Sequence, residues 1–447
     1  MSAREIIHLH LGQAGSQIGG SLWNTYCNEY KVERSGKYNG QNPTNISHIF
    51  KNVGESYYKP RAVFFDLDPE TKQTFRDTSL KRLFGEDQFI TGREDASNNF
   101  ARGFYNLGRE FRDEMIDGIR RESEACDSLQ GFYIFRSLGG GTGSGVGSLL
   151  IQELQHEFGG KDKMDFSIAP SSVLNTSVTE PYNVVHSMYN NIEDNDISVM
   201  MDNKALYSVS ANKLDIEVPR YRDLNRLVSR VVQSVTSTLG AGAGANRMTL
   251  SEFKTNLIPF SRIHHTIPSY APLSTNSRSH YHRMSVTEIT RSAFDEESTF
   301  LSVGDMKDSK FLSSCLLYRG DVSRREANQA KNTILDEYQF VDWAPNGIKL
   351  NIQNRGYTKS TPSKSVTMLG INTALKDSLY AMNTRFDMML QKRAFMHWYL
   401  MEGMEELEFH DAKEELFALE KDYNELHNDD DSYTRPLKSQ GYSVYEY

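Results

Sequence analysis

The chain carries the glycine-rich stretch Leu138-Gly139-Gly140-Gly141-Thr142-Gly143-Ser144-Gly145-Val146-Gly147 between two apolar runs, at 131–135 and 146–154. This order predicts a strand, a loop and a helix. Glycine backbones can come close to a ligand, so successive N–H groups converge on phosphate oxygens beside the positive end of a helix. We therefore predict a phosphate-binding loop. A flexible linker is the alternative, but linkers lie between polar segments.

Two common phosphate-binding motifs do not fit this loop. A Walker A loop needs Gly-Lys-Ser/Thr, and no lysine lies between Phe135 and Leu154. The dinucleotide fingerprint follows the first strand of a sheet, whereas about 130 residues precede this loop. The charge of the phosphates must therefore be neutralised by backbone dipoles and a metal.

Composition bounds the class of protein. A chain of 447 residues is longer than a single hydrophobic core usually supports, so two or three domains are expected. The net charge of -9 argues against nucleic acid as a partner. Three widely spaced cysteines favour buried thiols in a reducing compartment over disulfides or a zinc site. With no long apolar run and no signal-peptide pattern, we expect a soluble intracellular protein that has no membrane segment.

Strand, polar loop and helix recur along the first 240 residues, which predicts a mostly parallel sheet with helices on both faces. The predicted strands are 5–11, 61–65, 131–135, 166–170 and 197–201, and the last helix is 224–239. Asp66 and Asp68 follow the second of these strands, where ligands collect in parallel sheets, and they suggest magnesium or ribose contacts. Capping of the helix that begins near Glu70 is the alternative. The polar loop 91–99 leads into the amphipathic segment 100–121. The loop could merely cap that segment.

Later segments predict further parts of the fold. Residues 34–59 lack periodicity and predict a long surface loop, and the Gly-Ala repeat at 240–245 predicts a hinge or a close-approach loop. In the next region, 270–273 and 312–319 are typical of strands and 286–294 of a helix. Ten acidic residues between Glu402 and Glu425 form either a solvated face or a docking face for basic partners.

These observations divide the chain into five parts. The predicted parts are a nucleotide-binding domain at 1–203, a core helix at 204–239, an intermediate α+β domain at 240–375, C-terminal helices at 376–427 and a disordered tail at 428–447. The fold class is therefore α/β, with a mostly parallel N-terminal sheet that binds nucleotide, a second α+β domain and C-terminal helices.

Several motifs, in this order, resemble the tubulin family over almost the whole chain. They are Gly12-Gln13-Ala14-Gly15, Pro60-Arg61-Ala62-Val63, the segment 90–96, the glycine loop, Glu180-Pro181-Tyr182-Asn183, Leu224-Asn225-Arg226 and Lys392-Arg393-Ala394-Phe395. Other segments are similar to the alpha type: Leu214-Asp215-Ile216-Glu217, Arg319-Gly320-Asp321-Val322, Glu420-Lys421-Asp422-Tyr423 and the terminal Glu446-Tyr447.

The resemblance implies a GTP site with Mg²⁺. The residues implied for the phosphates are Gln13, Ala14, Ser137, Gly140, Gly141, Thr142 and Gly143, with Asp66, Asp68, Asp95 and Asn98 around the phosphates and the metal. Those implied for the nucleoside are Thr176 and Glu180 on the ribose, Asn203 and Asn225 on the guanine edge, and Tyr221 stacked on its face. Asp68 is the implied metal ligand. It replaces the glutamate of alpha-type chains and is one methylene shorter, which favours a bridging water. The alternative for Tyr221 is that its side chain packs in the core and does not contact the base.

In this family catalysis is shared between subunits. The segment 250–257 resembles the alpha-type segment whose glutamate points at the nucleotide of the next subunit, so Glu252 would orient or deprotonate the attacking water there. The GTP of this chain would face a partner that lacks the acid and would stay intact. A lone glutamate on a helix is usually only solvated, so this assignment rests on the resemblance alone.

The resemblance implies an alpha-type subunit that pairs with beta-type tubulin, contacts lateral tubulin neighbours and polymerises into cytoplasmic, cytoskeletal microtubules. Microtubule-associated proteins and motors would bind at the acidic C-terminal helices. The sequence departs from the alpha type at 240–245, by one residue inserted before Glu252, and by shorter segments at 34–45 and 352–368. Two alternatives stay open: a self-sufficient GTPase of the same fold, and a regulator that does not polymerise.

Overall fold

The computed structural model describes residues 4–40, 46–76, 78–170, 177–240, 247–273, 284–353 and 363–428. The strands are β1 (Glu5–Leu11), β2 (Phe50–Gly54), β3 (Tyr57–Pro60), β4 (Ala62–Asp66), β5 (Phe89–Thr91), β6 (Leu129–Ser137), β7 (Asp162–Ala169), β8 (Ile197–Asp202), β9 (His265–Ala271), β10 (Lys310–Gly320), β11 (Gln339–Phe340), β12 (Ile348–Gln353) and β13 (Lys364–Asn372). The principal helices are α1 (Gly12–Tyr30), α2 (Glu70–Arg76), α3 (Leu107–Glu124), α4 (Gly147–Glu157), α5 (Glu180–Asn191), α6 (Asn203–Asn212), α7 (Tyr221–Leu239), α8 (Leu250–Leu257), α10 (Val286–Phe294), α11 (Arg324–Glu337), α12 (Leu375–Gln391), α13 (Met396–Leu400) and α14 (Glu406–Asn428).

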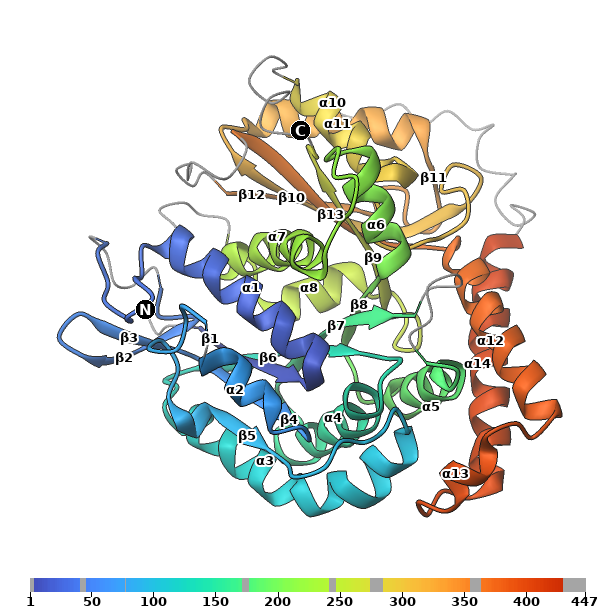
Figure 1. Cartoon of the computed structure of the whole chain (residues 1–447). Helices are drawn as coiled ribbons and strands as arrows, with labels where there is room; N and C mark the ends of the chain where they lie inside the picture. The colour runs from blue at the N-terminus through green and yellow to red at the C-terminus, as the bar shows by residue number, and fades with distance from the viewer. Residues whose placement is uncertain are drawn as a thin grey trace.

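One continuous sheet runs through the part of the chain that the structure describes (Figure 1). Its strand order is β11-β10-β13-β9-β8-β7-β6-β1-β4-β5, and β12 pairs with β10. The strands from β5 to β8 pair in parallel, so their carboxyl ends lie at the same edge. This confirms the predicted mostly parallel sheet.

Alternating residues of the sheet enter two different cores. Ile7, Leu9 and Leu11 of β1 pack in one core with residues of α3, α4 and α5. Ile6 of β1 packs in the other core with residues of α1 and α7. Figure 1 shows these two groups of helices on opposite faces of the strands. Burial on both faces explains why the strand sequences are apolar runs instead of alternating patterns.

The strand β9 joins the parallel region to the second part of the chain. It pairs in parallel with β8 and antiparallel with β13. It begins at His265, five positions before the strand predicted at 270–273, and α10 matches the helix predicted at 286–294. The range 204–239, expected to hold one core helix, contains both α6 and α7. The five domain boundaries stay predictions.

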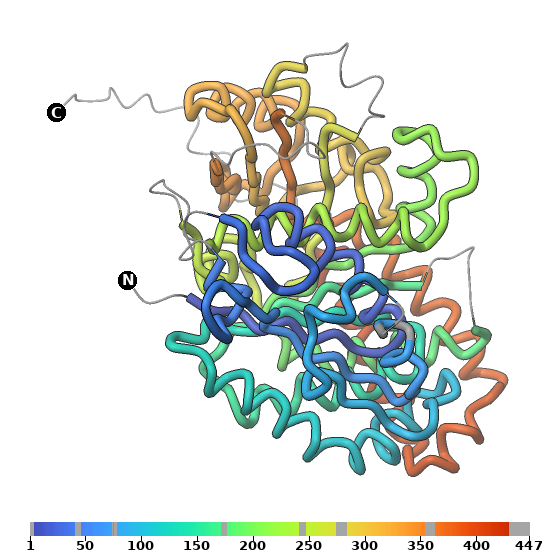
Figure 2. The backbone as a smooth tube through the Cα atoms, turned by 60° about the vertical axis from the view of Figure 1, so that its left-hand side comes forward, coloured from blue at the N-terminus to red at the C-terminus, as the bar shows by residue number. Residues whose placement is uncertain are grey.

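The C-terminal helices pack along one side of the molecule, where Figures 1 and 2 draw them in orange-red. Both α12 and α14 contact α5. The Gly-Ala segment falls almost wholly within 241–246, and the predicted tail within 429–447; both ranges lie outside the described residues.

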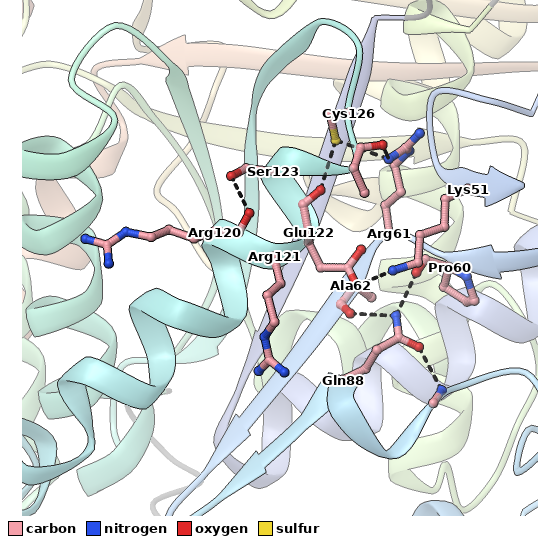
Figure 3. Close-up of polar contacts among 12 residues, drawn as sticks. Lys51, Pro60, Arg61, Ala62, Gln88, Arg120, Arg121, Glu122, Ser123 and Cys126 are labelled. Atoms are coloured by element: carbon pink, nitrogen blue, oxygen red, sulfur yellow. Dashed lines mark hydrogen bonds and ion pairs between the residues drawn. The ribbon is translucent and has the colours of Figure 1, made fainter. Parts of the chain in front are cut away.

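The predicted surface loop at 34–59 is wrong, because it contains the hairpin β2–β3. Phe50 and Tyr58 of the hairpin are buried in the core beneath α1. The Nζ of Lys51 lies 2.5 Å from the carboxylate of Glu122 on α3. Figure 3 draws this ion pair. Each strand is only four or five residues long, with Lys51 and Asn52 between apolar positions, so no period-two pattern is visible in the sequence.

The expectation that all three cysteines are buried is also wrong. Cys27 and Cys315 are buried, but Cys126 is half-buried. The Nη1 of Arg61 donates to its Sγ at 3.1 Å (Figure 3). Within the described ranges, no helix combines the length and apolar character needed to cross a membrane.

Candidate functional site

The glycine loop lies at the carboxyl end of β6 and folds tightly against its neighbours. A methyl group added at Gly143 would lie 2.4 Å from the carbonyl oxygen of Ser137, and one at Gly141 would lie 2.7 Å from the N of Asn99. At Gly140 the same methyl group would meet no atom within 4 Å. The loop is therefore packed on both sides of Gly140 and open at Gly140 itself.

Two helix N-termini meet at this opening. Gly12 begins α1 with a φ of +66°, and its added methyl group would lie 3.5 Å from the N of Gly143. The π-helical turn η4 (Thr142–Val146) begins in the glycine loop and continues into α4. Neither N-terminus receives a side-chain cap from the residues described. Unpaired N–H groups and the positive ends of two helices make this an anion site, so the residues present fit a phosphate group.

The predicted phosphate residues lie around this opening. Gln13 is exposed and Ala14 half-buried in the first turn of α1. Ser137 ends β6 directly before the glycine loop, and Thr142 lies within the loop at the start of η4. The Oγ of Ser137 accepts from the N of Gly139 at 3.4 Å. Asn98 follows Ser97 in a loop where both residues have left-handed backbones, at φ 54° and 49°. The structure thus brings these residues of three separate segments to one edge of the sheet.

Three aspartates form an acidic group beside the phosphate loops. Asp66 ends β4 and is buried, and its carboxylate accepts from the Oγ1 of Thr71 at 2.5 Å. Burial raises the pKa of Asp66 to about 6, and the charges of Asp68 and Asp95 raise the pKa as well. The Oδ1 of Asp68 accepts from the N of Glu70 at 2.9 Å, so Asp68 does cap the start of α2. That bond uses one of its two oxygens.

No three His, Cys, Asp or Glu side chains among the described residues come close enough together to hold a metal ion by themselves. Mg²⁺ characteristically keeps waters and takes one or two carboxylates together with substrate phosphates. The aspartates beside the phosphate loops fit such a partial shell and do not fit a closed protein cage.

The residues predicted for the nucleoside lie farther along the same edge. Glu180 begins α5, is buried, and lies alongside Gly139, whose added methyl group would be 3.1 Å from the Cγ of Glu180. Asn203 begins α6 and is half-buried. Tyr221 and Asn225 lie one turn apart on α7. The side chain of Tyr221 is 53% exposed, so Tyr221 is not an aromatic residue of the core. Thr176 lies outside the described residues.

Glu252 lies at the opposite edge of the sheet. It belongs to α8, whose first residue Leu250 donates its N–H to the Oε1 of Gln130, near the amino end of β6. The Oγ of Ser251 donates to Asp162, the first residue of β7, at 2.5 Å. Strands rise about 3.3 Å per residue, so β6 separates α8 from the glycine loop by roughly 25 Å. Glu252 does not join the predicted nucleotide residues of its own chain.

Glu252 also has a local structural role. Its N–H donates to the Oγ1 of Thr249 at 3.0 Å, and its carboxylate accepts from the N of Thr249 at 3.4 Å. This reciprocal pair is a capping box that starts α8. The side chain is exposed to solvent on the surface of this edge.

One residue of the site was missed from the sequence. Asn183 is fully buried, and its amide bonds both to the loop that holds Asn98 and to the glycine loop. It stands three residues after Glu180 on α5, so both face the same side of the helix. A polar amide directly before the apolar pair Val184 and Val185 was the available signal.

Two family models match this chain, and known proteins align with nearly all of it. The family model described as "Tubulin/FtsZ family, GTPase domain" matches residues 5–211, and the one described as "Tubulin C-terminal domain" matches residues 261–383. A tubulin alpha chain of Pneumocystis carinii is 41% identical over 439 residues, which cover 95% of this chain and 97% of the relative. A tubulin alpha chain of Dictyostelium discoideum is 42% identical over 444 residues, with 95% and 97% covered. The tubulin alpha-3 chain of Zea mays is 42% identical over 436 residues, with 95% and 96% covered.

Proposed function

Because the chain belongs to the tubulin family and carries its GTPase domain, we propose that it is an alpha-type subunit of microtubules that pairs with beta-type tubulin. It holds GTP on the glycine loop, contacts further tubulin molecules along and between filaments, and supplies Glu252 to the GTP of the next subunit. The resemblance over nearly the full length of three alpha chains supports the alpha type over the beta type.

The observation that carries this proposal is the placement of Glu252 and the glycine loop at opposite ends of β6. One subunit cannot bring the two together. A head-to-tail contact places α8 of one subunit over the nucleotide edge of the next. Contacts of this kind use two different surfaces and do not close, so they build filaments.

Both edges present large apolar side chains for such contacts. Phe260 and Trp343 are 49% and 53% exposed on the α8 side, with ring centroids 5.9 Å apart. Val178 and Trp398 are 66% and 54% exposed near the nucleotide edge, in addition to Tyr221. Exposed aromatic groups of this size favour protein contacts over solvent. The two patches belong to different surfaces, as a head-to-tail filament requires.

At the joined edges the chain's own residues have separate tasks. The N–H groups at Gly12 and in the glycine loop hold the phosphates, while Asn203, Tyr221 and Asn225 hold the base and Thr176 with Glu180 the ribose. Asp68, through a water, and phosphate oxygens would hold Mg²⁺, which neutralises phosphate charge when it is bound. Glu252 of the neighbouring subunit orients or deprotonates the attacking water. The GTP of this chain meets no such acid from a beta-type partner and stays intact.

The outer helices provide the proposed surface for microtubule-associated proteins and motors. Part of the acidic run is already paired: Glu415 and Asp422 contact Arg262, at 2.8 and 3.6 Å. Asp411 and Glu414 are exposed on α14. Acidic groups on a solvent-facing helix attract basic segments of partners. The chain's membership of the tubulin family supports a place in cytoplasmic microtubules. Its net charge of -9 argues against binding to nucleic acid, and we propose no binding to membranes.

The test is co-polymerisation with a beta-type tubulin, followed by phosphate release from the lattice. Glu252→Gln keeps the capping box, because Gln also serves at this position, but removes the base. We expect these lattices to form and to hydrolyse GTP about 100-fold more slowly than the parent. Thr249→Ala is the control; it removes the cap and keeps the carboxylate, and is expected to retain the parental rate.

Each rival function has its own outcome in this experiment. Hydrolysis by the purified chain alone, independent of its concentration, would show a self-sufficient GTPase. GTP binding without co-polymerisation, judged by electron microscopy, would show a regulator that does not polymerise. Parental hydrolysis in Glu252→Gln lattices would remove Glu252 from the mechanism.

A further inference from the structure

A small buried cavity lies between α5 and the strands from β6 to β9, since residues of each of these elements line it. The space open to the centre of a water molecule is about 10 Å³, and one buried water needs on the order of 10–15 Å³ by this measure. Every residue of the lining is buried. The polar lining includes Arg136, Asp165, Asn191, Asn195, Ser198 and His265. The cavity is therefore polar and has the size of one water molecule.

The register of the strands explains why a hollow exists here. Asp165 of β7 pairs with Ser198 of β8, which pairs in turn with His265 of β9. Paired residues of neighbouring strands lie about 4.8 Å apart, so the Cα atoms of Asp165 and His265 are separated by roughly 10 Å. The small side chain of Ser198 lies between the two longer ones. It leaves open the space that a longer side chain at this position would fill.

Four polar side-chain atoms of this lining are buried and have no hydrogen-bond partner within the part of the chain that the structure describes. They are the Oδ1 atoms of Asp165, Asn191 and Asn195 and the Nδ1 of His265. Native proteins rarely leave even one buried polar atom unpaired, because its lost hydration is not replaced. Four such atoms around a single cavity therefore indicate an occupant that bonds to them.

The unpaired atoms select the chemistry of this occupant. Three of them are oxygens that only accept, so the occupant must donate hydrogen bonds or be a cation, and an anion is excluded. The lining carries no net charge. Arg136 donates to Asp165 through both Nε and Nη2, and burial, together with the neighbouring His264, lowers the pKa of His265 well below its ordinary value. A bare cation here would lack a countercharge, which favours a neutral donor.

We propose that the cavity binds one structural water molecule, which bonds to the Oδ1 of Asp165, to the Nδ1 of His265 and to one of the two asparagine oxygens. A water molecule both donates and accepts, so it suits Nδ1 in either tautomer of the imidazole. The water links β7 to β9, which lie on either side of β8, and it ties both strands to the end of α5. This site is independent of GTP and of any partner chain.

A structure of the full-length protein, at a resolution that shows ordered waters, tests the site directly. We expect a density peak at about 2.7–3.2 Å from both the Oδ1 of Asp165 and the Nδ1 of His265. An empty cavity would overturn the proposal. A peak surrounded by oxygens closer than about 2.6 Å would also overturn it, because such distances are typical of a metal ion.

Thermal unfolding of variants at His265 gives an independent test, because a dry and a hydrated cavity predict changes of opposite sign. His265→Phe keeps a ring of similar size but removes the bond to the water. We expect the melting temperature to fall by about 1–2 °C. In a dry cavity the same change removes an unpaired buried nitrogen, and the melting temperature would rise. A rise would therefore overturn the proposal.

His265→Asn is the conservative variant, because its amide retains a hydrogen-bonding group close to the position of Nδ1. With a bound water it should melt above His265→Phe. Without a water it adds a small unpaired polar group and should melt below His265→Phe, which would again contradict the proposal. The comparison depends only on the order of the two melting temperatures.

Tyr182→Phe is the matched control. The hydroxyl of Tyr182 is also buried without a partner among the described residues, but Tyr182 does not line this cavity. Its removal should not lower the melting temperature. An equal fall in Tyr182→Phe and His265→Phe would show that the loss at His265 does not arise from a water in this cavity.

Melting in equal concentrations of potassium, sodium and choline chloride distinguishes water from a monovalent cation. We expect the difference between the parent and His265→Phe to be the same in all three salts. A larger difference in potassium or sodium than in choline would show a bound cation and would overturn the assignment of water.

Discussion

Arg136 and Asp165 form a buried ion pair directly beneath the glycine loop. The Nε and Nη2 of Arg136 both donate to the Oδ2 of Asp165, at 2.9 and 2.7 Å, and the side chains are only 3% and 1% exposed. Arg136 is the residue before Ser137, where the glycine loop begins. The pair therefore joins the carboxyl end of β6 to the middle of the neighbouring parallel strand β7, just before the phosphate site starts.

Asp165→Asn should destabilise the fold, because it leaves the guanidinium of Arg136 buried without a countercharge. We expect the free energy of unfolding to fall by about 3 kcal/mol, measured by urea denaturation. Asp117→Asn is the control, since Asp117 pairs with Arg120 on the surface, and it should leave the midpoint unchanged. An equal shift in both variants would contradict a special contribution from the buried pair.

Gly140→Ala and Gly143→Ala should separate binding from folding. At Gly140 the added methyl group meets only open space, so the fold should be unaffected, while the methyl group occupies the phosphate opening. We expect an unchanged melting temperature and a GTP dissociation constant raised at least tenfold, about 1.4 kcal/mol.

At Gly143 the added methyl group would collide with the carbonyl oxygen of Ser137. Gly143→Ala should therefore lower the melting temperature, whatever its effect on GTP. Normal GTP affinity in Gly140→Ala would show that the opening at Gly140 is not the phosphate site.

The buried carboxyl of Asp66 should make stability depend on pH in the absence of nucleotide and Mg²⁺. Burial raises its pKa from 3.8 to about 6, so between these two values the folded state binds more protons than the unfolded chain. The contribution of Asp66 to stability is therefore greatest below about pH 4 and falls as the pH rises through 6. The total fall is about 3 kcal/mol at most.

Asp66→Asn cannot ionise and keeps an acceptor for Thr71, so we expect it to remove this fall in urea denaturation between pH 4 and 7. Asp113→Asn, an exposed change on α3, is the control and should follow the parent. A parental pH profile in Asp66→Asn would show that Asp66 is not the titrating group.

Lys51→Ala should loosen the hairpin β2–β3, because it leaves the buried carboxylate of Glu122 without its cation. Lys51 is partly exposed, so we expect a loss of about 2 kcal/mol in the free energy of unfolding, less than for a fully buried pair. The double variant Lys51→Met with Glu122→Leu should recover most of it. Additive losses in the double variant would contradict the pairing.

The alternation of strands and helices was predictable because each parallel strand is buried on both faces and reads as an apolar run. The glycine loop was predictable for a different reason: its backbone must approach both a ligand and its own neighbours, as the close approach at Gly143 shows. The hairpin β2–β3 was not predictable, because the burial of Phe50 and Tyr58 depends on α1, which is distant in sequence.

The site was predictable only in part. Ligand positions at strand ends follow from the topology of a parallel sheet. The opposite placement of Glu252 depends on where α8 docks, through Gln130 and Asp162, which no local spacing records. Asn183 was missed because its four bonds reach segments from Asn98 to Tyr399, and a single polar residue in a helix does not reveal its partners.

The uninterrupted sheet gives the subunit different stiffness in different directions. A load that enters at the glycine-loop edge and leaves at the α8 edge runs along the strands and is carried by covalent backbone. A load applied across the strands is carried by the hydrogen bonds between strands and by the side chains packed on both faces. Between β8 and β9 only two residue pairs are in register, Ser198 with His265 and Val199 with Thr266. We therefore expect the subunit to resist stretching along the direction in which partners would stack, and we expect shear between β8 and β9 to meet few hydrogen bonds of the strand ladder.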